Sequence, residues 1–135
     1  MPYSINWYIE NEIIYIHYSG TPTYDEFRDA ILTANDLIEG SSRILVHIIS
    51  DLGDVTQIPS SKDALKLARE VGAHERVGWT IFIRETSALT KMMVAMFTSL
   101  TKVRTRSFNT IDEAINFLEN MDPNLNWEKV NDYYL

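Results

Sequence analysis

The stretch of sequence that decides the fold lies at residues 43–49 and reads Arg43-Ile44-Leu45-Val46-His47-Ile48-Ile49. Most of its side chains are apolar, and most of those are β-branched. A nearly continuous apolar run of this length is typical of a strand that is buried on both faces. The residues that follow, 51–54, contain a Gly and two Asp, which favour a turn. We therefore predict a central strand of an α/β sheet over residues 43–50, ended by a turn.

Helical segments flank this strand on both sides along the chain. Three of them begin with a capping box, in which a hydroxyl and a carboxylate three residues apart satisfy backbone N–H groups that the helix start leaves open: Thr23 with Glu26, Ser60 with Asp63, and Thr110 with Glu113. Apolar residues then recur at helical spacing. A further helix, residues 87–100, is apolar on nearly all sides. The sequence therefore predicts four main helices.

Four other segments have the composition of strands. Residues 5–10 and 13–18 are joined by a short turn, so they form an antiparallel hairpin. Residues 77–83 are apolar, and residues 103–108 alternate and are basic, which places them towards an edge of the sheet. The order is β-β-α-β-α-β-α-β-α, and strands separated by single helices are parallel neighbours. The predicted fold class is therefore α/β: a single domain over residues 1–122 with a five-stranded mixed sheet whose first strand is antiparallel.

The overall composition limits the class of protein. The chain has 135 residues and no Cys, so we expect a domain that folds without disulfides or zinc-thiolate sites. No apolar stretch is long enough to span a membrane and no signal peptide is visible, so we expect a cytoplasmic protein that is not transmembrane. A formal net charge of −7 disfavours binding to nucleic acid.

The charge is unevenly distributed along the chain. Residues 43–106 carry ten basic and six acidic side chains, whereas the segments before and after them are strongly acidic. Two interpretations stay open: a solvated surface with complementary halves, or a basic patch that binds an anionic partner. The basic patch would lie near Lys91, Lys102, Arg104 and Arg106. A solvated face is the more common outcome for a run of charges.

Residue patterns typical of catalysis are scarce. His17, His47 and His74 have no spacing that indicates a metal site, and no nucleotide-phosphate loop or nucleophile elbow occurs. Asp51 and Asp54 could serve as general acid and base, but no nucleophile accompanies them. We therefore expect a protein that is not an enzyme and that has neither a cofactor nor a metal.

Two segments carry more apolar surface than one sheet contact covers. Met92, Met93, Met96 and Phe97 belong to the apolar helix, which either packs as core or meets a second subunit or a lipid-like ligand. The tail, residues 123–135, carries Trp127 and further aromatics at roughly helical spacing, so we expect it to dock on the domain or on a second subunit. From both segments we predict a homodimer whose interface uses the helix, the tail or both.

The loop after the central strand contains the residues Asp51, Leu52, Val55, Thr56, Ile58, Ser60 and Ser61. It resembles the central loop of SpoIIAA-like, or STAS, domains, whose pattern is Asp-Leu-Ser-x-Val-x-x-Ile-Asp-Ser-Ser-Gly-Leu. The order of elements also resembles that family over residues 3–122. Two departures lie directly beside the serines: Pro59 replaces the acidic residue before them, and Lys62 replaces the glycine after them.

The resemblance implies the family's fold and a role in protein interaction, as in anti-sigma-factor antagonists. In the family the serine that matches Ser61 is phosphorylated, so Ser61, with Ser60 beside it, is the phosphorylation candidate and a kinase-like anti-sigma factor is the implied partner. The fold is shared with lipid-binding CRAL-TRIO domains, which implies an apolar ligand as the alternative. Our first hypothesis is a non-enzymatic regulatory module, the second is a small carrier, and the third is an enzyme that uses the loop site Asp51, Asp54 and Thr56.

Overall fold

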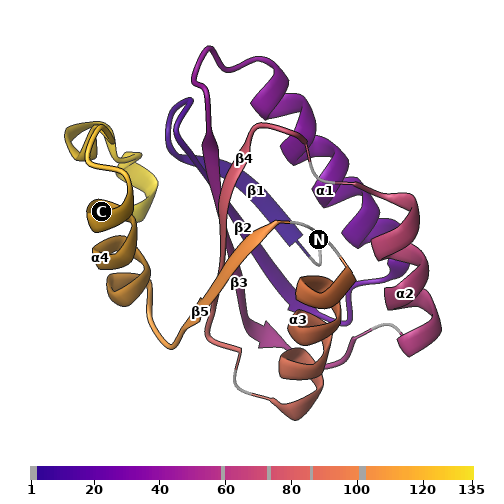
Figure 1. Ribbon diagram of the computed structural model, residues 1–135. Helices are drawn as coiled ribbons and strands as arrows, with labels where there is room; N and C mark the ends of the chain where they lie inside the picture. The colour runs from indigo at the N-terminus through magenta and orange to yellow at the C-terminus, as the bar shows by residue number, and fades with distance from the viewer. Residues whose placement is uncertain (1–2, 59, 73, 86, 101–102) are drawn as a thin grey trace.

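The computed structural model describes residues 3–58, 60–72, 74–85, 87–100 and 103–135. Its elements follow the predicted order (Figure 1): β1 Tyr3–Ile9, β2 Ile13–Gly20, α1 Tyr24–Glu39, β3 Val46–Val55, α2 Ser61–Glu70, β4 Val77–Ile83, α3 Ala88–Leu100, β5 Arg104–Phe108 and α4 Ile111–Met121. Two short 3-10 helices follow, Trp127–Lys129 and Asp132–Tyr134. Among the described residues, no helix is long and apolar enough to cross a membrane.

The strands form one sheet in the order β1-β2-β3-β4-β5, so each strand pairs with its neighbours in the sequence. β1 is antiparallel to β2, and the other pairs are parallel. Right-handed crossovers that advance across a sheet in one direction place all their helices on the same face. Accordingly α1, α2 and α3 cover one face, and α4 lies with the tail on the other (Figure 1). The predicted fold class, with its antiparallel first strand and with β5 at an edge, is confirmed.

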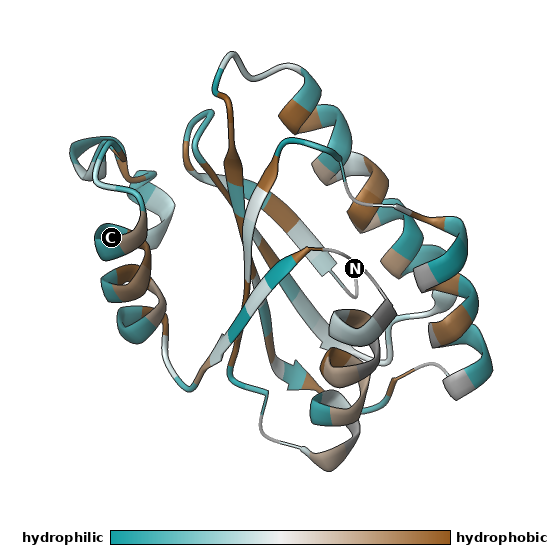
Figure 2. Cartoon of the chain, viewed as in Figure 1, coloured by the Kyte–Doolittle hydropathy of each residue, from teal (hydrophilic) through white to brown (hydrophobic). Residues whose placement is uncertain are grey.

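A hydrophobic core lies on each face of this sheet. Ile14 and Ile16 of β2 pack with Phe27 of α1 on the three-helix face, whereas Ile49 of β3 packs with Leu118 of α4 on the opposite face. Figure 2 shows the same division, because the hydrophobic stripes of the helices turn towards the strands. The central strand β3 is therefore covered on both sides, as its apolar run predicted.

The boundaries of β3 differ from the prediction at both ends. Residues 43–45 precede the strand, which begins at Val46 and continues to Val55 through the expected turn. Asp51 is buried, and its carboxylate accepts hydrogen bonds from Tyr15 of β2 and from Arg84 directly after β4, in addition to the backbone N–H of Gly53. Residues 54–55 still pair with β2. The predicted turn at 51–54 is therefore wrong, because tertiary hydrogen bonds outweigh the local preference of Asp and Gly for turns.

The predicted helix starts are present. The Thr23 hydroxyl accepts a hydrogen bond from the backbone N–H of Glu26 at 3.2 Å, and the Glu26 carboxylate accepts one from the backbone N–H of Thr23 at 2.9 Å. Ser60 and Thr110 likewise cap α2 and α4 through the backbone N–H three residues later. At α4 the box differs in one bond, because the Glu113 carboxylate accepts from the hydroxyl of Thr110 rather than from its backbone.

The tail, residues 123–135, lies against its own domain. Val130 forms an isolated bridge to β1. The ring of Tyr134 lies 5.0 Å from the ring of Tyr8 and 4.9 Å from the ring of Tyr15. The tail therefore covers the part of the sheet formed by β1 and β2, next to the part that α4 covers.

Candidate functional site: an apolar cavity and a polar cluster on opposite faces of the sheet

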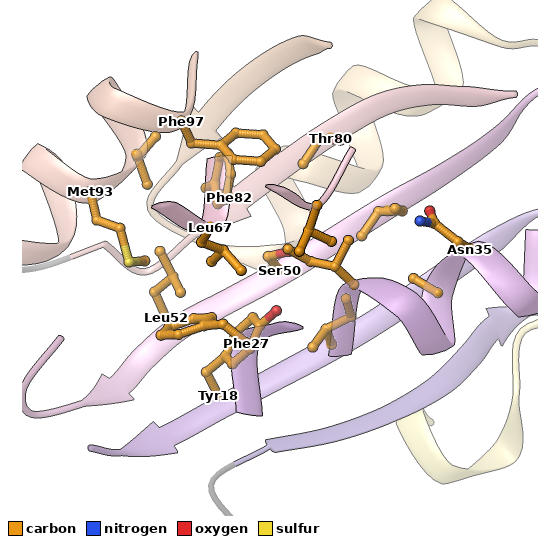
Figure 3. Close-up of a pocket in the computed structure, with 16 residues that line it drawn as sticks. Tyr18, Phe27, Asn35, Ser50, Leu52, Leu67, Thr80, Phe82, Met93 and Phe97 are labelled. Carbon is orange, nitrogen blue, oxygen red and sulfur yellow. The ribbon is translucent and has the colours of Figure 1, made fainter. Parts of the chain in front are cut away.

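An apolar cavity of about 100 Å³ lies between the sheet and the helices α1, α2 and α3. Phe27 and Ala34 of α1, Leu67 of α2, and Met93 and Phe97 of α3 line it from the helical side (Figure 3). Proteins are packed to a density at which voids larger than a water molecule are few, so a void of this size is a distinct feature of the core. Its lining comes from elements far apart in the sequence.

Three residues on the sheet side of the lining carry hydroxyl groups: Tyr18 of β2, Ser50 of β3 and Thr80 of β4 (Figure 3). The two small side chains, Ser50 and Thr80, are each only 6% exposed. These two side chains point to the same face because Ser50 pairs with Phe82, and Phe82 lies two residues after Thr80. The cavity can therefore hold an apolar group and offer a hydrogen bond to a polar atom attached to it.

The apolar candidates from the sequence divide between different surfaces. Met93 and Phe97 line the cavity, and Phe97 meets Phe82 edge to face at 5.8 Å. Met92 is 44% exposed on the same helix. Trp127 belongs to the core on the opposite face, with α4 and the tail. The side chain of Met96 lies outside the described residues. Of the four candidates whose side chains are described, the structure thus brings Met93 and Phe97 together.

A polar cluster lies on the α4 face, at the carboxyl ends of β2, β3 and β4. The buried Asp51 carboxylate accepts hydrogen bonds from the Tyr15 hydroxyl at 2.6 Å, from Arg84 Nε at 2.9 Å and Nη2 at 3.1 Å, and from the Gly53 backbone N–H at 3.0 Å. Arg84 Nη2 also lies 3.2 Å from Asp54 Oδ2, which His17 Nε2 contacts at 2.6 Å. The two predicted acids are therefore joined by an arginine.

The backbone around this cluster is fitted to the arginine. Arg84 has a φ of 57°, in the left-handed region, directly after β4. A Cβ atom at Gly53 would clash with the Arg84 guanidinium, so a larger residue there would displace it from its present position. Hydrogen bonding to Asp51 raises the pKa of Arg84, and the contacts with His17 and Arg84 lower the pKa of Asp54. The Asp54 carboxylate is thus stabilised in the ionised form.

The cluster has little capacity for chemistry. The oxygens of the Asp51 carboxylate already accept hydrogen bonds from Tyr15, Gly53 and Arg84, so they are poorly placed to take a proton from a substrate. Burial and the bond to Asp51 also raise the pKa of the Tyr15 hydroxyl. In the described ranges, no group of three His, Cys, Asp or Glu side chains is placed to hold a metal ion. The arrangement fixes the ends of three strands.

The predicted loop site does not form one constellation. Thr56 and Ser60 are exposed beyond β3, whereas Asp51 is buried among its partners. Ser60 is the N-cap of α2, and Ser61 is the first residue of that helix. The side chain of Ser61 lies outside the described residues, so the prediction that it is exposed stays a prediction.

Sequence reasoning missed several residues that the structure brings together. Arg84 directly follows a strand, as Asp51 and Asp54 were expected to do, and the carboxyl ends of neighbouring parallel strands meet at one edge. That rule could have linked Arg84 to the acids.

Each His also contacts a carboxylate that is distant in the sequence: His17 with Asp54 at 2.6 Å, His47 with Asp122 at 2.8 Å, and His74 with Glu39 at 2.6 Å.

Comparison with known proteins identifies the fold. No protein family and no curated protein sequence matches the chain. A solved structure of an uncharacterized protein of the DUF3478 family with a SpoIIAA-like fold, from Shewanella loihica PV-4, is 15% identical with a TM-score of 0.59, over 86% of this chain and 93% of that one. The anti-sigma factor antagonist SpoIIAA in its unphosphorylated form is 16% identical with a TM-score of 0.56, over 92% and 99%. At these identities the likeness shows a SpoIIAA-like fold.

Proposed function

With the SpoIIAA-like fold as its premise, we propose that this chain is a non-catalytic binding protein whose cavity under α1, α2 and α3 holds a small apolar ligand. The observation that carries the proposal is the cavity of about 100 Å³, lined by Phe27, Ala34, Met93 and Phe97. A ligand that covers this apolar lining removes it from water, which contributes roughly 25 cal/mol per Å² of apolar surface. Such a ligand binds the folded chain and so stabilises it.

The size and the lining of the cavity define the ligand class. An engineered apolar cavity of roughly 150 Å³ takes benzene, so this one suits a short alkyl chain or a small ring. The hydroxyls of Ser50 and Thr80 suit a ligand with one hydroxyl or carbonyl group. No catalytic step is part of the proposal, since the carboxylates of Asp51 and Asp54 are held by Arg84 on the other face.

Replacing Ala34 by Leu tests the cavity directly. Ala34 lines the cavity from α1, so the larger side chain should fill it, raise the free energy of unfolding by about 1 kcal/mol and abolish ligand binding. Ala30, one turn earlier on the same helix, is fully buried but does not line the cavity, so Ala30→Leu should instead destabilise by about 1–3 kcal/mol through overpacking.

Thermal unfolding with n-hexanol or benzene provides the measurement. Either compound should raise the Tm of the wild-type chain and leave that of the Ala34→Leu variant unchanged. Native mass spectrometry of protein purified from cells should show a bound apolar compound in the wild type alone. If neither probe raises the Tm and nothing copurifies, the carrier function is wrong.

A second candidate is a regulatory module that binds a protein partner in the cytoplasm. It is favoured by the exposed Thr56 after β3, by the exposed Ser60 at the start of α2, and by the likeness in fold to an anti-sigma factor antagonist. Ser61 is the first residue of α2, at the positive end of the helix dipole, so the helix would tolerate a phosphate there. We propose Ser61 as the modified residue and a kinase-like anti-sigma factor as the partner.

Phosphopeptide mass spectrometry of the protein from its own host should find phosphate on Ser61. Finding only unmodified Ser60 and Ser61 would contradict regulation by phosphorylation.

Self-association through α3 belongs to the same proposal. Met92 is 44% exposed on this apolar helix, while Trp127 and Tyr134 of the tail pack on their own domain. We therefore assign the homodimer interface to α3 rather than to the tail. Sedimentation equilibrium at micromolar concentration should give a dimer for the wild type and a monomer for Met92→Lys, with Lys91→Ala unchanged as the control. A wild-type monomer would contradict the proposal.

A further inference from the structure

The two edges of the sheet differ in how they are covered. On the outer side of β1, the backbone N–H of Asn131 in the tail donates to the Tyr8 carbonyl at 2.9 Å, and the Asn131 side chain donates to the Trp7 carbonyl at 3.2 Å. β5 forms the other edge and pairs only with β4 among the described strands. The Thr105 carbonyl of β5 accepts a hydrogen bond from the guanidinium of the next residue, Arg106, at 3.1 Å. In the described ranges no strand lies on the outer edge of β5, so this edge can accept one.

Two arginines stand on this open edge and point to one face. Arg104 and Arg106 are both exposed and alternate along β5, so they project to the same side of the sheet. Their guanidinium carbons lie 6.0 and 5.2 Å from the centre of the Trp79 ring, and that of Arg106 lies 5.9 Å from the ring of Phe117. Stacking on aromatic rings restrains the two side chains and leaves their N–H groups available.

Neither arginine is neutralised by a carboxylate in the part of the chain that the structure describes. The ion pairs there involve Arg43 and Arg84 and the three histidines, but not Arg104 or Arg106. The predicted patch of four basic residues is not one surface, because Lys91 lies on α3, which covers the opposite face, and Lys102 lies outside the described residues. The positive feature is thus a pair of arginines on an otherwise acidic chain of net charge −7.

We infer that the outer edge of β5 binds an extended segment of a partner protein that carries acidic side chains at alternate positions. Its backbone adds a strand to β5, and its carboxylates meet Arg104 and Arg106. Alternate residues on two paired strands share the same spacing of roughly 7 Å, so the charges fall into register. Charge-assisted bonds from guanidinium to carboxylate are the strong class of hydrogen bond.

Other occupants fit the observations less well. Pairing of β5 with β5 of a second copy would bring four arginines together, and like charges on adjacent strands destabilise pairing. A nucleic acid would be repelled by the net charge of −7. Charged residues on an open edge strand also serve to prevent edge-to-edge aggregation, a role that requires no partner. Specific binding of a peptide therefore distinguishes the inferred role from this common one.

The experiment is an NMR titration of the full chain with the blocked hexapeptide TEVEVT, in which the two Glu occupy alternate positions, and with its neutral match TQVQVT. The acidic peptide should shift the backbone amide signals of residues 104–108 and slow their hydrogen exchange. Replacing both Arg104 and Arg106 by Ala should weaken binding about tenfold or more, with the affinity also falling as salt is raised. Lys91→Ala on the opposite face should leave the affinity unchanged.

Three results would overturn the inference. If millimolar acidic peptide shifts no signal of β5, the arginines serve only to prevent edge-to-edge aggregation. If the neutral peptide binds equally well, binding does not depend on charge. If the oligonucleotide dT8 binds the same residues more tightly, the edge is a nucleic-acid site. None of them bears on the cavity, which lies on the other face of the sheet.

Discussion

Ending the chain after Pro123 should leave most molecules unfolded or aggregated. The removed residues include Leu125, which is 6% exposed, and Trp127, Val130 and Tyr134, which pack against the core of the α4 face. Burial of one large apolar side chain stabilises by roughly 1.5–3 kcal/mol, so losing several costs about 5 kcal/mol or more. The free energy of unfolding of native proteins is about 5–15 kcal/mol in total. The expected loss therefore equals the whole stability of a domain at the lower end of that range.

The tail also gives a matched pair of point variants. Tyr134 packs on Tyr8 and Tyr15, whereas Tyr133 beside it is 79% exposed. Tyr134→Ala should lower the free energy of unfolding by about 3 kcal/mol, and Tyr133→Ala by less than about 1 kcal/mol. Urea unfolding followed by circular dichroism measures both variants and the truncated chain. A truncated chain with the wild-type midpoint would show that the tail is an appendage without a stabilising role.

Asp122→Ala should give the largest loss of stability from a single polar side chain. Asp122 follows α4, and its carboxylate accepts hydrogen bonds from Arg43 and from Nε2 of His47 at 2.8 Å. His47 is 2% exposed, and its Nδ1 accepts from the backbone N–H of Trp79 at 2.9 Å, so the neutral ring carries its proton on Nε2. Without Asp122, this N–H and the guanidinium of Arg43 lose their acceptor inside the protein.

The expected cost of that change is about 3 kcal/mol, because it breaks a partly buried charged pair and leaves Arg43 with only the Glu12 carboxylate, 4.0 Å away. Asp122→Asn keeps an acceptor but removes the charge, so it should cost about half as much. Glu119→Ala is the control, since Glu119 is exposed on the same helix and should change stability by less than about 0.5 kcal/mol. Urea unfolding of the three variants gives the comparison, and equal midpoints for Asp122→Ala and Glu119→Ala would refute the role of the cluster.

The same cluster predicts the pH dependence of stability. Burial lowers the pKa of His47 below 6.5, although the Asp122 carboxylate opposes this. The unfolded chain therefore takes up a proton below about pH 6.5 that the folded chain does not, so stability falls as the pH drops from 7 towards 5. Burial raises the pKa of Asp122, but the hydrogen bonds from Arg43 and His47 outweigh burial, so the pKa lies below the ordinary value of 3.8. The contribution of the Asp122 carboxylate to stability is therefore lost only in stronger acid. An NMR titration of the His47 ring with a midpoint at or above pH 6.5 would contradict this.

The element order followed from local sequence patterns. These patterns were reliable where the contacts that form an element lie within a few residues of one another. Thr23 and Glu26 satisfy each other at the start of α1, as their spacing predicted. The apolar run that ends at Ile49 became the central strand, because a strand covered on both faces has no polar side to display. The boundaries were less reliable, since Asp51 continues β3 by means of partners that no local pattern contains.

The candidate site was predicted only in part. The sequence singled out Met93 and Phe97, but not the hydroxyls of Ser50 and Thr80 that share their cavity. It also singled out Asp51 and Asp54, but not the arginine between them. Helical spacing shows which side of a helix is buried, and strand alternation shows which face a residue takes, but neither shows what lies opposite.

By itself, the sequence determined the fold class, the helix starts, the edge position of β5 and the acidic balance of the chain, because these depend on periodicity, capping and composition within a few residues. Only the tertiary structure decided that all three crossover helices share one face and enclose a cavity, that the tail is needed to cover the other face, and that Arg104 and Arg106 stack on Trp79. The physical reason is that these features are contacts between residues tens of positions apart, and the order and pairing of the strands set such contacts.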